Sequence, residues 1–139
     1  MAEDDQTSVT NFLTNLVTSV SHNRPPQLKA IHVHGDTTRL PSDRVLAIGL
    51  AVNEFVANAM KHAFPTGSDG VIDISFREDG DHYLLHMADN GVGLPPDLDT
   101  KNARGMGLKV IHSLAQQLGG AVDHDIRAQG TAFTIRFPL

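Results

Sequence analysis

The sequence predicts an α+β fold, a two-layer α/β sandwich in which helices lie on one face of a mixed sheet. Two observations carry this prediction. Segments with helical and strand periodicity follow one another in the order αβαββ, a long loop, then αββ, and the later strands come in hairpin pairs. The 139 residues are 40% hydrophobic and 19% charged, which suits one folded core. We therefore expect residues 1–139 to form a single domain.

Each element follows from a local pattern. In the helices apolar residues recur every three or four positions, whereas in the strands they alternate with polar ones. Pro25 and Pro65 follow the first two helices, and Ser42 or Asp43 is a suitable N-cap for the second. The expected elements are a helix over 6–21, a strand over 28–34, a helix over 42–64, strands over 71–77 and 83–88, a loop over 90–105, a helix over 108–118, and strands over 121–127 and 131–137.

The composition excludes several classes of protein. Acidic residues outnumber basic ones, 16 against 11, and the net charge of -5 has the wrong sign for an electrostatic nucleic-acid binder. Cysteine is absent, which excludes disulfides and thiolate metal sites. No apolar run reaches the roughly 18 residues of a membrane span, and the acidic start is unlike a signal peptide. We expect a cytoplasmic location, without nucleic-acid or membrane contact.

One side of the long helix carries chemically useful groups. Glu54, Asn58, Lys61 and His62 fall within a sector of about 100° around the helix axis. The carboxylate can orient or deprotonate a nucleophile, the amide oxygen suits Mg²⁺, and the ammonium can pair with phosphate. Spacing alone favours an ordinary solvated helix face.

Two glycine-rich segments border the long loop. Residues 89–93 follow a strand with the sequence DNGVG, and residues 105–108 precede a helix with the sequence GMGL. Glycines let the backbone approach a ligand, and amides at a helix N-terminus attract phosphate. Neither segment completes a P-loop or a dinucleotide-binding pattern. Each glycine pair alone is also typical of an ordinary turn.

Four ordered segments together resemble the motifs of one superfamily. Residues 53–64 (NEFVANAMKHAF), 89–95 (DNGVGLP), 104–108 (RGMGL) and 130–138 (GTAFTIRFP) resemble the N box, G1 box, G2 box and terminal strand of the GHKL ATPases. Within this superfamily the chain resembles the ATP-binding catalytic domain of a bacterial sensor histidine kinase of the alternative-HisKA subgroup. It contains no tryptophan, so we expect it to lie close to but outside the HWE group. The resemblance implies the Bergerat-type histidine kinase-like ATPase fold.

The resemblance also implies roles for individual residues. Glu54 would orient or activate the nucleophile, Asn58 would coordinate Mg²⁺, and Asp89 would accept a hydrogen bond from the adenine amino group. The segment between Pro95 and Arg104 would form an ATP lid. The expected ATP-binding residues are Asn58, Lys61, His62, Asp89, Gly91, Gly93, Arg104, Gly105, Gly107, Leu108 and Thr131, with Glu54 catalytic.

These residues imply a protein-histidine kinase domain that transfers the γ-phosphoryl group of ATP with Mg²⁺. The expected partners are a phosphoacceptor helical hairpin and, through it, a response regulator. His22 follows a short helix and has no room for a hairpin, so we expect an excised or a free-standing catalytic domain, with helix 6–22 leading from an absent hairpin. The alternatives are a serine kinase of the anti-sigma-factor type and a nucleotide-binding regulatory module without transfer activity. The Lys61-His62 pair favours the histidine kinase.

Two further patterns have simpler interpretations. His32 with His34, and His82 with His86, alternate along strands without a carboxylate at ligand spacing in the sequence, so we expect no metal site there. The apolar stripe of the first helix, which includes Phe12, is expected either to complete the core or to form a docking face for the hairpin.

Overall fold

The computed structural model describes residues 6–92, 108–126 and 130–138. Its elements in chain order are β1 (Gln6–Ser8), α1 (Val9–Ser21), β2 (Leu28–Gly35), β3 (Arg39–Pro41), α2 (Ser42–His62), β4 (Gly70–Asp79), β5 (His82–Asp89), α3 (Leu108–Gln117), β6 (Ala121–Ile126) and β7 (Thr131–Pro138). None of the helices in these ranges is long and apolar enough to span a membrane.

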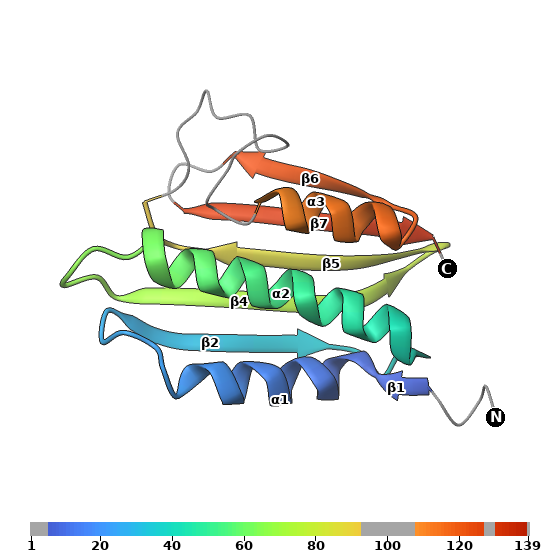
Figure 1. The fold of residues 1–139 in the computed structure, drawn as a ribbon, viewed down its shortest axis with the longest axis horizontal. Coiled ribbons are helices and arrows are strands. Elements are labelled where there is room, and N and C mark those ends of the chain that lie inside the picture. Colours follow the sequence, from blue (N-terminus) through green and yellow to red (C-terminus); the bar gives the residue numbers. More distant parts are fainter. Residues whose placement is uncertain (1–5, 93–107, 127–129, 139) are drawn as a thin grey trace.

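Five strands form one mixed sheet in the order β2-β4-β5-β7-β6. The pair β2 and β4 is parallel, while the other neighbours are antiparallel. The parallel pair needs a crossover connection, which α2 provides. Figure 1 shows α2 and α3 side by side across one face of the sheet, with α1 along the β2 edge. The expected α+β fold with helices on one face is confirmed.

The sheet has a buried face and an exposed face. Along β4, Ile72, Ile74 and Phe76 are fully buried, whereas Asp73 and Arg77, each next to one of them in the strand, are exposed. Because side chains alternate across a strand, the first set faces the helices and the second set faces away from them. The core therefore lies between the sheet and its helices.

Helix α1 is part of this core. Val9 and Leu13 are fully buried, and Phe12 is partly buried against the same cluster. A Cβ atom placed on Gly49 of α2 would clash with the ring of Phe12, so the glycine lets the two helices approach closely. The contribution of Phe12 to the core is thereby established, and the docking of a hairpin on it stays a prediction.

The structure differs from the expected elements at three places. Strands β1 and β3 were not expected, because three-residue strands are too short to show a period. Pro41, rather than Ser42 or Asp43, holds the N-cap position of α2, with no side-chain capping bond. The helix ends at His62, with Ala63 as its C-cap, rather than at Phe64, because Pro65 disfavours helical geometry in the residue directly before it.

Candidate functional site

Asp89 is a buried carboxylate at the end of a central strand. Only 5% of the residue is exposed, and its Oδ1 atom accepts a hydrogen bond of 2.8 Å from the backbone N–H of Gly91. In the sheet it lies opposite Ile72 of β4 and opposite Thr131 of β7, which is also buried. Two of the expected ATP-binding residues therefore form one cross-strand pair.

Two glycines fix the backbone around Asp89. A Cβ atom on Gly91 would clash with the carbonyl oxygen of Ala63, and Val92 N–H donates to that same oxygen at 2.9 Å. Gly130 has a φ of +89°, and a Cβ atom there would clash with the carbonyl oxygen of Asp89. Because Gly91 has no side chain, the turn after β5 packs directly against the end of α2. The expected part of Gly91 in ATP binding stays a prediction.

Asn90 extends the hydrogen bonding between β4 and β5. Its Oδ1 accepts from Val71 N–H at 2.7 Å, and its Nδ2 donates to the Asp69 carbonyl at 3.1 Å. A cavity of about 440 Å³ lies beside it, lined by residues of segments 64–70 and 90–92. Neither Glu54 nor Asn58 lines this cavity, so it does not by itself define the expected site.

Glu54 and Asn58 lie on the α3 side of α2. Gly49 faces Phe12 of α1, and Asn58 follows nine residues later, or about two and a half helical turns, which places it on the opposite side of the helix. Helix α3 packs along that side (Figure 1). Both side chains are half-buried. The expected solvated face is therefore partly enclosed at these two positions.

Asn58 carries an unsatisfied polar atom. Its Nδ2 is buried and has no hydrogen-bond partner among the described residues. Buried polar atoms are nearly always hydrogen-bonded, so this amide needs a partner that the described residues do not supply. The two ends of a side-chain amide are interchangeable by a 180° rotation, which would present the oxygen instead.

Comparison with known proteins decides the family. Residues 43–139 match the model of the histidine kinase-, DNA gyrase B-, and HSP90-like ATPases. The chain belongs to this family. The match spans the helix with Glu54 and Asn58, the turn after Asp89, and the last strand, and membership of this ATPase family implies ATP binding.

Known histidine kinases are similar over nearly the whole chain. Blue-light-activated histidine kinase 2 of Erythrobacter litoralis is 29% identical over 92% of this chain and 37% of its own length. Sensor histidine kinase PdtaS of Mycobacterium tuberculosis is 27% identical over 100% of this chain and 28% of its own. The chain thus spans about a third of the length of these relatives, and corresponds to the ATPase catalytic domain of a histidine kinase.

The solved structures agree. The histidine kinase domain of the blue-light-activated kinase EL346 of Erythrobacter litoralis superposes with a TM-score of 0.83 at 28% identity, covering 95% of this chain and 61% of that one. The blue-light kinases are of the HWE type, which agrees with the expected closeness to that group. Whether the chain lies outside the group stays a prediction.

The structure describes only some of the remaining residues that are expected to bind ATP. Lys61 and His62 are exposed at the end of α2, on the same side of the molecule as the Asp89 turn that contacts Ala63. Leu108 is the first residue of α3. The other expected residues lie outside the described part of the chain; they are Gly93, Arg104, Gly105 and Gly107. The expected lid over 95–104 also lies outside it.

The histidines of β2 require a correction. The sequence offered no carboxylate at ligand spacing, yet the parallel register of β2 and β4 places His32 directly beside Asp73. The two side chains form an ion pair in which His32 Nδ1 lies 3.3 Å from Asp73 Oδ1. The premise that these histidines lack an acidic neighbour is therefore wrong. In the sequence, the only sign of the His32–Asp73 contact was that both segments alternate as strands do. The two residues are 41 positions apart, and nothing in the sequence indicated the register between the strands.

Proposed function

We propose that this chain binds Mg-ATP and donates the γ-phosphoryl group to a histidine on a separate dimerisation and phosphoacceptor domain, within two-component signal transduction. The observation that carries the proposal is the buried Asp89 carboxylate, held by Gly91 N–H at 2.8 Å opposite Thr131. Such a carboxylate can accept a hydrogen bond from the adenine amino group, with Thr131 supporting the base through water.

Residues of α2 would act on the phosphates. The half-buried Asn58 has an amide atom without a partner in the described part of the chain, and an amide oxygen is a ligand that Mg²⁺ accepts. The ion would neutralise charge on the β- and γ-phosphates. Lys61 and His62 are exposed one turn further along α2, within reach of the triphosphate's negative charge.

Glu54 would serve the transfer itself. The bond between the γ-phosphorus and the bridging oxygen breaks, ADP leaves with the electron pair, and a bond forms between phosphorus and an imidazole nitrogen of the acceptor. Glu54 orients that imidazole and takes up its proton. The geometry of Glu54, one turn before Asn58 on the same side of α2, suits a group that works beside the metal-bound phosphates.

The remaining roles extend this scheme. Gly93 would let the chain pass close to the adenine base, and Gly105 and Gly107 would bring backbone amides to the phosphates, with Arg104 and Leu108 flanking these two glycines in the ATP site. Residues 1–139 would act as one ATP-binding unit, and α1 would lead from the phosphoacceptor hairpin. The hairpin would in turn pass the phosphoryl group to a response regulator.

Nucleotide titration tests the adenine assignment. We expect wild type to bind ATP with Mg²⁺ and to discriminate against GTP, whose carbonyl oxygen would face the Asp89 carboxylate. Asp89→Asn should weaken ATP binding roughly 10- to 100-fold, the loss of one charge-assisted hydrogen bond, and should narrow the gap between ATP and GTP. Asp123→Asn, at an exposed position of β6, is the control. Equal affinities of wild type for ATP and GTP would contradict the assignment.

A second test separates the two residues of α2. Asn58→Ala should weaken Mg-ATP binding by about tenfold or more and should match wild type when the metal is chelated. Glu54→Gln should leave ATP affinity nearly unchanged but slow transfer to a supplied phosphoacceptor hairpin by about 100-fold or more. Asn53 is another asparagine of α2 and lies about 140° from Asn58 around the helix axis. Asn53→Ala should change neither ATP affinity nor the rate of transfer. The division of roles is wrong if Glu54→Gln abolishes binding.

A further inference from the structure

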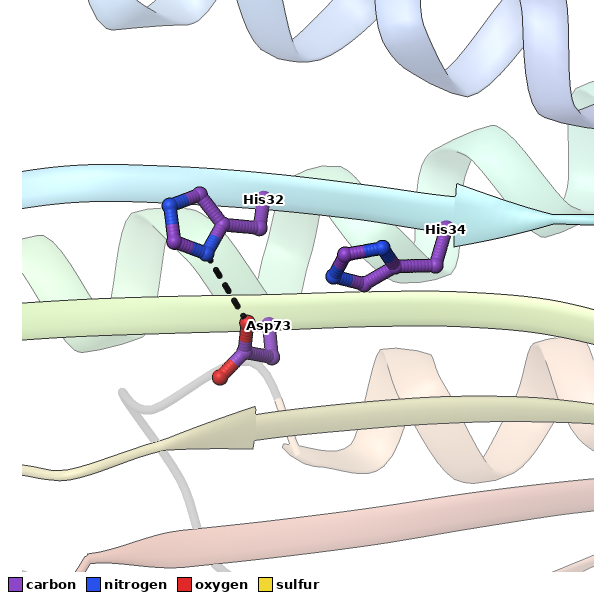
Figure 2. Close-up of side chains that lie close together, drawn as sticks. All are labelled: His32, His34 and Asp73. Atoms are coloured by element: carbon purple, nitrogen blue, oxygen red, sulfur yellow. Dashed lines mark ion pairs between the residues drawn. The ribbon is translucent and has the colours of Figure 1, made fainter.

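Three metal-ligating side chains meet on the outer face of the sheet. The parallel register pairs His32 of β2 with Asp73 of β4, and His34 follows two residues later on the same face of β2. Each residue offers one ligand atom, and these atoms all lie within 4.8 Å of one another. Figure 2 shows the three side chains in front of the strands, with the ring of His34 directed toward the pair and α2 and α3 behind the sheet.

The spacing is close to that of a metal centre. Zinc binds histidine nitrogen and carboxylate oxygen at about 2.0–2.2 Å, so two ligands of a tetrahedral site lie about 3.3–3.5 Å apart. The separation of His32 Nδ1 and Asp73 Oδ1 is 3.3 Å. The ligand atoms of the three residues lie within 4.8 Å of one another, and the exposed His34 ring can turn between rotamers about its two side-chain bonds without moving the backbone.

The ion pair between His32 and Asp73 does not explain why His34 lies beside it. His32 and Asp73 are both about half exposed, at 53% and 52%, and an exposed pair of this kind contributes little to stability. The ring centroid of His34 lies 6.1 Å from that of His32, at an interplanar angle of 70°. The arrangement places two imidazoles and one carboxylate around a single point on two hydrogen-bonded strands.

The donor set selects a class of ion. Imidazole nitrogens suit Zn²⁺, Ni²⁺ and Cu²⁺, whereas Mg²⁺ prefers an all-oxygen environment. We propose that His32, His34 and Asp73 form a binding site for one divalent transition-metal ion, with Zn²⁺ as the reference ion, on the face of the sheet opposite the helices. Solvent exposure leaves the remaining coordination positions to water. This site is separate from the one proposed for Mg-ATP on α2.

Zinc titration of the full chain, freed of any affinity tag and of bound metal, tests the proposal. Calorimetry should give one equivalent of bound Zn²⁺, and the imidazole nitrogen resonances of His32 and His34 should shift together. The decisive variant is His34→Ala, which leaves the ion pair intact and should lower zinc affinity about tenfold or more. His32→Ala and Asp73→Asn should have effects of similar size.

A second histidine–aspartate pair provides the matched control. His82 Nδ1 lies 2.7 Å from Asp81 Oδ1, and no third ligand joins that pair among the described residues. His82→Ala should leave zinc affinity unchanged. Thermal unfolding of metal-free His34→Ala should match that of wild type, because the residue is exposed. The proposal is overturned if zinc does not bind saturably, or if binding is as strong in His34→Ala as in wild type.

Discussion

The two faces of the central sheet hold their aspartates in opposite ways. On the helix-facing side Asp89 is 5% exposed, accepts a hydrogen bond from Gly91 and is flanked by glycines that admit no side chain. On the outer side the side chain of Asp73 is 52% exposed and pairs with His32 across a parallel register. The first arrangement is built from chain segments packed tightly against one another, and the second from strand pairing alone. We expect the buried side to govern stability and the outer side to tolerate change.

The largest expected effect compares two neighbours on β4. Ile74 is fully buried against the helices, so Ile74→Ala should lower the free energy of unfolding by about 2–5 kcal/mol, from lost burial and the cavity left behind. Asp73→Ala, one residue away on the outer face, should change it by less than about 1 kcal/mol. Urea unfolding of both variants measures the contrast. Comparable losses in the two variants would remove the distinction between the faces.

A smaller effect compares two glycines with the same backbone φ angle. Gly130 and Gly67 both have a φ of +89°, but a Cβ atom on Gly130 would clash with the Asp89 carbonyl whereas one on Gly67 has nothing within 4 Å. Gly67→Ala should cost about 1–2 kcal/mol through backbone strain alone. Gly130→Ala should cost roughly 2–4 kcal/mol, since overpacking adds to that strain.

The difference between the two alanine variants measures how tightly Gly130 holds the Asp89 backbone. Urea midpoints at an unchanged denaturant slope give the comparison. Nucleotide titration of the folded Gly130→Ala variant should also show weaker ATP binding, while Gly67→Ala should bind as wild type does. Equal destabilisation of the two variants would mean that the close approach to Asp89 is readily relieved.

The smallest effect concerns a third carboxylate, Asp36, at the end of β2. Burial raises the pKa of Asp36, but hydrogen bonds from Thr38 and from the Glu78 backbone outweigh it and leave the pKa below its usual 3.8. Thr38 N–H donates to Oδ1 and Glu78 N–H donates to Oδ2, each at 3.0 Å. A lowered pKa in the folded state stabilises the fold above pH 3.8, and this contribution is lost as the pH falls through the folded-state value.

Asp36→Asn removes the titrating group and tests this sign. The variant should be less stable than wild type near neutral pH, and the gap should narrow as the pH falls from about 6 to about 3. Chemical unfolding at a series of pH values measures it. A gap that stays constant over this range would show that the carboxylate's charge contributes nothing to the fold.

The sequence determined most of the local structure. Apolar periodicity is a property of consecutive residues, so the three helices and five sheet strands were predicted within a few residues of their observed ends. The same locality put Glu54 and Asn58 on one side of α2, and placed Asp89 at a strand end before a glycine turn. The family motifs are likewise short contiguous segments, and the match over residues 43–139 bears them out.

Only the tertiary structure decided which distant segments meet. The pairing of His32 with Asp73 depends on the register between β2 and β4, which core packing and the α2 crossover set and which no pattern within either strand encodes. The approach of Gly130 to Asp89 likewise depends on β5 and β7 being neighbours. Strands β1 and β3 are too short for any period and exist because they pair with each other. Contacts of this kind arise from packing between segments far apart in the chain, so a local pattern can name their members but not bring them together.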